Sequence, residues 1–163
     1  MEPALHLVLP TLIALVAGVR TDIALALAPL SLLFDLDIFL GPHRRLHSLV
    51  VLMAVSVPTA ILIAAVLPQA KPLYLIGLFY VSSHLLLDVF IGEMALFYPL
   101  SPKGYGLRLQ IGIENTPVRI RSIRLEVKTV PEIKESPEVY TLLSGQGAVS
   151  LLLFLAVALN TLE

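Results

Sequence analysis

The chain has 163 residues, of which 57% are hydrophobic and 14% charged, with a mean hydropathy of +0.90 and a net charge of −1. Soluble domains carry about 25% charged residues, so this composition excludes an ordinary soluble domain and predicts an integral membrane protein. The absence of cysteine excludes disulfides and thiolate chemistry, and leaves nitrogen and oxygen ligands for any metal. We expect no nucleic-acid partner.

Five segments approach the roughly 20 mostly apolar residues that a membrane-spanning helix needs: 3–19, 23–40, 46–67, 73–91 and 140–159. The first lacks the basic start of a secretory signal, because the first basic residue is Arg20. It is therefore predicted to be a membrane helix, joined to the second by a tight turn at 20–22. Pro10, Pro29 and Pro58 fall inside these segments, where kinks are expected and not breaks.

The pattern changes to strict alternation at Leu107, Leu109, Ile111 and Ile113, which predicts a half-buried strand. A turn signal at 114–117 precedes a second alternating run, which slips in phase at 122–123. We expect an antiparallel hairpin with a bulge. The basic side chains of its second strand either face anionic headgroups or face water.

Basic residues in the connections set the orientation. With five spans, the N-terminus, link 41–45 and segment 103–138 share one side and carry nine Lys or Arg, against Arg20 and Lys71 on the other side. The positive-inside rule places the richer side in the cytoplasm. The expected fold is an all-α, multi-pass cell-membrane protein with about five transmembrane helices and a small cytoplasmic β-hairpin. Its parts are a four-helix membrane domain (1–102), the hairpin segment (103–138) and a fifth helix (139–163).

Ionisable side chains inside apolar segments are the most informative feature, because they are costly in a membrane and usually functional. They fall at the starts of odd-numbered spans and the ends of even-numbered ones, so the topology brings them to one face, on the cytoplasmic side. Gly41-Pro42 predicts the start of a helix on which two of them form an i,i+4 pair, and the fourth span holds another such pair. The seven residues are His6, Asp35, Asp37, His43, His47, His84 and Asp88.

Imidazoles one helical turn apart can grip one ion, and carboxylates add oxygen ligands and negative charge. We therefore predict that all seven residues bind one or two divalent metal ions, with Zn favoured and Mn or Fe as alternatives. Taken singly, His6 also fits an interfacial histidine, Asp35 and Asp37 fit helix caps or partners of Arg44 and Arg45, and His84 with Asp88 fits a buried hydrogen-bonded pair. Ser48 either orients a ligand or bonds the helix backbone one turn back.

The motifs resemble those of the YdjM-like, LexA-regulated membrane-bound metal-dependent hydrolases. That family has Gly-His, Pro-Asp-x-Asp, His-Arg-x-x-Thr-His-Ser and Ser-His-x-x-x-Asp elements, followed by an aromatic-Pro segment. The matching stretches here are 5–6, 34–37, 43–48, 83–88 and 97–99. Leu5, Phe34 and Leu46 replace the usual Gly, Pro and Thr, and Ile38 stands where a further histidine can occur. The likeness covers about residues 5–109 and implies hydrolase activity.

The first functional hypothesis is a membrane-embedded hydrolase whose metal activates water at headgroup depth. We assign its catalytic centre to Asp37 and His47 among the ligands, with Arg44 or Arg45 steadying an anionic group of a phospholipid or other phosphate ester. A divalent-cation or proton-coupled transporter is the second hypothesis. A non-catalytic scaffold whose metal only joins the helices is the third. The sequence leaves the oligomeric state open.

Overall fold

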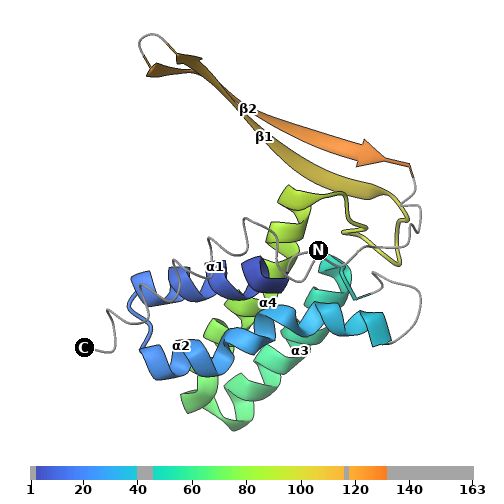
Figure 1. The fold of residues 1–163 in the computed structure, drawn as a ribbon. Coiled ribbons are helices and arrows are strands. Elements are labelled where there is room, and N and C mark those ends of the chain that lie inside the picture. Colours follow the sequence, from blue (N-terminus) through green and yellow to red (C-terminus); the bar gives the residue numbers. More distant parts are fainter. Residues whose placement is uncertain (1–2, 40–45, 116–117, 132–163) are drawn as a thin grey trace.

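The computed structural model of the protein describes residues 3–39, 46–115 and 118–131, and the side chains of these except 37–39 and 111–121 (Figure 1). These described residues form four α-helices, two 3₁₀ segments and one hairpin, in the order α1 (Pro3–Val16), α2 (Thr21–Leu27), η1 (Ala28–Phe39), α3 (Leu49–Val66), η2 (Pro68–Ala70), α4 (Lys71–Ile91), β1 (Gly104–Asn115) and β2 (Val118–Val130). The predicted fifth span, 140–159, lies outside the described residues.

Within the described residues, two helical stretches are long and apolar enough to cross a membrane, α3 and Pro68–Ile91. Helix α1 has 14 residues and rises about 21 Å, which is shorter than the roughly 30 Å of a hydrocarbon core. The described residues therefore do not show the five predicted membrane-spanning helices. Helices α1 and α3 continue through Pro10 and Pro58, so these prolines break neither helix.

The second predicted span is not one α-helix. After α2 the chain continues as the 12-residue 3₁₀ segment η1. Three residues per turn align side chains at i and i+3, and the buried residues Ala28, Ser31 and Phe34 follow that spacing. An α-helix would spread these three over a much wider arc. The 3₁₀ geometry therefore turns all three toward the other helices.

The turn between α1 and α2 lies slightly before its predicted position. Helix α1 ends at Val16, Gly18 takes a φ of 83°, and Arg20 is the residue before α2. Glycine suits this left-handed conformation because it lacks a Cβ. The Arg20 guanidinium donates hydrogen bonds to the Asp22 carboxylate, and these lower the pKa of that exposed group.

The predicted antiparallel hairpin and its bulge are confirmed. The register shifts between Gly112, which lies opposite Ser122, and Ile113, which lies opposite Ile120. Arg121 is thus the extra residue of β2, directly beside the predicted change of phase. Figure 1 shows the hairpin leaving the helices near the end of α4 and extending well beyond them.

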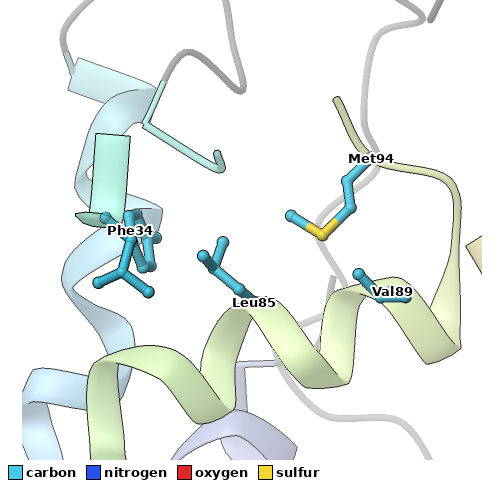
Figure 2. Packing of buried hydrophobic residues seen from close by; sticks show 5 residues of the cluster. Phe34, Leu85, Val89 and Met94 are labelled. Carbon is cyan, nitrogen blue, oxygen red and sulfur yellow. The ribbon is translucent and has the colours of Figure 1, made fainter. Parts of the chain in front are cut away.

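An apolar cluster joins η1, α3 and α4 to the start of the chain segment that leads to β1. Its buried members are Phe34, Leu52, Leu85, Val89 and Met94. In Figure 2, Phe34 and Leu85 face each other across the space between η1 and α4, and Met94 reaches toward Val89 and Leu85 from the far side. This cluster fixes the end of α4 relative to η1, and so positions the polar side chains described next.

Candidate metal centre

Polar side chains from four parts of the chain meet at one end of the helices. His6 comes from the first turn of α1, Asp35 from η1, His47 from the segment before α3, and His84 and Asp88 from the last two turns of α4. They form two overlapping groups that could hold a metal ion, His6–His84–Asp88 and Asp35–His47–His84. The structure thus brings together five of the seven predicted ligands. His43, Arg44, Arg45 and the side chain of Asp37 lie outside the described residues.

Two carboxylates lie close to the same pair of imidazoles, those of His47 and His84. The Nε2 atoms of His47 and His84 are 3.2 Å apart, and Oδ2 of Asp88 lies 3.5 and 3.3 Å from them. Oδ1 of Asp35 lies 3.8 Å from His47 Nε2 and 3.6 Å from His84 Nε2. Tetrahedral zinc, with bonds of about 2.0–2.2 Å to nitrogen and oxygen, needs ligand separations of about 3.3–3.6 Å. Three of the five separations, 3.3, 3.5 and 3.6 Å, fall in that range, and the other two, 3.2 and 3.8 Å, lie 0.1–0.2 Å outside it.

Three of the four carboxylate oxygens of Asp35 and Asp88 lack hydrogen-bond partners. Both oxygens of Asp35 and Oδ2 of Asp88 are buried without one. Buried acceptors of this kind are costly, because a hydrogen bond to water has been lost without replacement. A cation held between these carboxylates and the two imidazoles would give the buried oxygens that face it a positively charged partner. The donor set of two nitrogens and two oxygens fits Zn, Mn or Fe.

A backbone carbonyl fixes the tautomer of His84. Nδ1 of His84 lies 2.6 Å from the Ser31 carbonyl oxygen, in η1. A carbonyl only accepts hydrogen bonds, so Nδ1 carries the proton and donates it. In the neutral ring the lone pair is then on Nε2, the atom that faces His47 and Asp88. Metal-binding histidines are commonly oriented in this way by a partner on the other ring nitrogen.

His6 contacts the second oxygen of the Asp88 carboxylate. Its Nε2 lies 3.0 Å from Asp88 Oδ1, and its ring lies against that of His84 at a tilt of 34°, with centroids 4.2 Å apart. An ionised carboxylate only accepts, so His6 Nε2 is the donor. That bond uses Asp88 Oδ1, so Asp88 Oδ2 is available to bind an ion together with His47 and His84. Because the single Nε2 lone pair of His84 serves one ion, the described residues fit one metal, with His6 holding a ligand in place.

Exposure differs among the side chains of the cluster. The side chains of His6 and His84 are fully buried and that of His47 is 2% exposed, whereas that of Asp35 is 19% exposed. The Phe34 ring lies 5.7 and 5.8 Å from the His47 and His84 rings and covers another side. Among these side chains that of Asp35 is the most exposed, although its two oxygen atoms are buried.

Ser48 has a role that neither sequence interpretation described. Its Oγ caps α3 by accepting a hydrogen bond from the Val50 amide, and it lies 2.6 Å from the Tyr98 carbonyl and 3.1 Å from the Leu96 carbonyl. This serine therefore ties the start of α3 to the segment after α4, and so holds His47 beside α4.

The Ser31 carbonyl that orients His84 was not predictable from the sequence, because every residue has a backbone carbonyl and no residue type marks this one.

No protein family, curated protein or solved structure matches this chain. The resemblance to the YdjM-like hydrolases therefore rests on the four short motifs and stays a prediction.

Proposed function

We propose that the protein is a membrane-embedded, metal-dependent hydrolase that acts on a phosphate ester of a lipid. The observation that carries this proposal is the cluster of His and Asp side chains that could hold a metal ion, in which three buried carboxylate oxygens lack hydrogen-bond partners. A divalent ion held there supplies Lewis acidity and lowers the pKa of water to near neutrality.

The three shortest separations between possible ligand atoms favour His47, His84 and Asp88, whose ligand atoms lie 3.2–3.5 Å apart. Two imidazoles and one carboxylate form the usual ligand set of hydrolytic zinc sites, which keep a fourth position for water. Asp35 stands at that fourth side, slightly farther away and partly exposed. In the proposed reaction its carboxylate orients the attacking water and accepts its proton.

Membrane location is supported by how little of α3 is buried. Only 11% of the Leu49–Val66 window and 33% of the Pro68–Ile91 window is buried within the protein. An apolar helix in the core of a soluble protein would be mostly covered, whereas a lipid-facing helix exposes its side chains. The basic residues of the connections favour the cytoplasmic side for the metal end.

A hydrocarbon-bearing substrate is supported by an apolar hollow beside the cluster. The hollow has a volume of about 250 Å³ and lies between η1, α3 and α4. Its wall includes Leu33, Leu52 and Val81, and the last two pack with Phe34, which covers the two imidazoles. An acyl chain in the hollow would lie on the side of the site that Phe34 covers. Arg44 and Arg45, outside the described residues, remain the predicted phosphate partners.

One observation favours a second candidate, a metal that only joins the helices. If Asp35 Oδ1 binds the ion directly, four protein ligands close the tetrahedron and no position is left for water. The substitution Asp35→Asn, made in the full chain in lipid nanodiscs, distinguishes the two candidates. The hydrolase keeps its metal through the other three ligands and loses cleavage of phosphomonoester and phosphodiester lipids. The scaffold loses metal and thermal stability together, and never cleaves these lipids.

The transporter hypothesis has less support. Intramembrane ion pathways usually place their polar groups near the middle of the bilayer, whereas this cluster lies at the first turn of α1 and the last turns of α4. Flux of divalent ions into liposomes that is lost in His47→Ala, without any ester cleavage by the unaltered protein, would establish transport and overturn the hydrolase.

A further inference from the structure

The hairpin has one apolar and one polar face. Residues directly opposite each other in an antiparallel pair point to the same side of the sheet. Leu107 lies opposite Val127, and Leu109 lies opposite Leu125, so these pairs share one face with Ile123. The alternate positions carry the other face: Gly106 opposite Lys128, Arg108 opposite Glu126, and Gln110 opposite Arg124.

The base of the hairpin shows which face joins the apolar cluster between the helices. Leu107 packs against the cluster that contains Val89 and Met94. On the other face, Lys128 Nζ lies 3.4 Å from Glu93 Oε1, and a Cβ on Gly106 would come within 2.6 Å of the Gly92 carbonyl oxygen. Both faces therefore contact the end of α4 at the base of the hairpin, and the apolar face is the one that joins the apolar cluster between the helices.

Beyond the helices, the described part of the chain leaves this apolar face largely exposed. Leu109 is 51% exposed, Leu125 is 61% exposed, and Ile123 and Val127 are each 64% exposed. A two-stranded hairpin is only marginally stable in water without something packed on its apolar side. A contiguous exposed apolar patch marks an interaction surface.

The attachment of the hairpin identifies the partner. Met94 and Tyr105 exchange two backbone hydrogen bonds of 2.9 and 2.8 Å, which fix β1 just after the end of α4. If α4 spans the bilayer, that end lies at the headgroup region, and the apolar face of the hairpin joins the apolar cluster between the helices there. The surface that it meets there is lipid. The opposite face, with Arg108, Arg124 and Glu126, is left to headgroups and water.

We propose that the β1–β2 hairpin lies along the membrane surface, with Leu109, Ile123, Leu125 and Val127 inserted among the outermost acyl carbons. This is the β-ribbon counterpart of an interfacial amphipathic helix. The proposal rests on the membrane location given under the proposed function, and it does not depend on the metal or on hydrolysis.

The chain contains no tryptophan, so single tryptophans report their surroundings without background. Leu125→Trp and Arg124→Trp place the probe at adjacent exposed positions on opposite faces, in the full chain reconstituted in phosphatidylcholine vesicles with brominated acyl chains. We expect L125W to emit at shorter wavelength and to lose most of its emission to the bromine, and R124W to keep both properties of a solvated probe. Ile123→Trp and Glu126→Trp repeat the comparison, in case one variant disturbs the hairpin.

Ile61→Trp, at a 66% exposed position of α3, separates failure of this proposal from failure of the membrane location. Quenching of I61W without quenching of L125W and I123W overturns the surface contact and leaves the membrane location standing. Absence of quenching in all of them overturns both. Blue-shifted L125W emission that bromine does not quench, and that depends on the protein-to-lipid ratio, would assign the face to a second copy of the chain and overturn the lipid contact.

Discussion

Replacement of His6 tests whether this residue binds the metal ion itself or only orients a residue that binds it. In the structure His6 Nε2 donates to Asp88 Oδ1 at 3.0 Å, while Asp88 Oδ2 faces the imidazoles of His47 and His84. Losing a hydrogen-bond partner of a metal ligand typically weakens metal affinity 10- to 100-fold. His6→Ala should therefore weaken binding by that factor, or about 1.4–2.8 kcal/mol, and still bind one ion per chain.

The matched variant is His6→Gln, because its side-chain amide can also donate to Asp88 Oδ1. It should recover most of the affinity that His6→Ala loses, whereas a role in packing alone predicts no such recovery. The assay is competition for Zn²⁺ between the full protein in nanodiscs and a chelating dye, with circular dichroism to verify folding. His47→Ala provides the contrast, since a direct ligand is lost.

Two results would refute this reasoning. Complete loss of bound metal in a folded His6→Ala protein would make His6 a ligand and shift the ion toward the His6–His84–Asp88 group. An unchanged affinity would mean that the contact between His6 and Asp88 does not orient the carboxylate.

Three further substitutions test the framework around the site by thermal unfolding in detergent and by metal content. Ser48→Ala removes the cap of α3 and should cost about 1 kcal/mol with metal retained; loss of metal at full stability would make Ser48 a ligand-orienting residue instead. Tyr80→Phe removes the buried hydrogen bond to the Ala24 carbonyl and should cost about 0.5–1.5 kcal/mol, and no change would contradict the importance of that bond. Gly106→Ala places a Cβ 2.6 Å from the Gly92 carbonyl oxygen and should loosen the hairpin, seen as faster proteolysis within β1 and β2; unaltered cleavage would show that the base of the hairpin can shift to accommodate the methyl group.

The sequence predicted the convergence of the polar residues because that inference needs only the order of the helices. Alternation of chain direction brings His6, Asp35, His47, His84 and Asp88 to one end even if the helix bounds are wrong by several residues. The hairpin was equally readable, since the pleat imposes a strict two-residue period and the slip in phase near Ser122 marks the bulge.

Other features left little trace in the sequence. The three-residue spacing of the buried residues Ala28, Ser31 and Phe34 matches the 3₁₀ geometry of η1. This spacing cannot be recognised from the sequence, because nearly every position of the segment is hydrophobic. Five spans were predicted from apolar length, and α1 is shorter than its apolar segment because the chain turns at Gly18. Ser48 was ambiguous because its partners, the carbonyls of Leu96 and Tyr98, are about 50 residues away.

The central claim is that His47, His84 and Asp88, with Asp35 beside them, hold one divalent ion. Elemental analysis of the full protein, purified without added chelator and shown to be folded, tests this most directly when the unaltered chain is compared with a His47→Ala, His84→Ala double variant. The account predicts one equivalent of Zn, Mn or Fe per chain, and none in the variant. A folded, unaltered protein that carries no metal and takes up none from micromolar Zn²⁺ would contradict it.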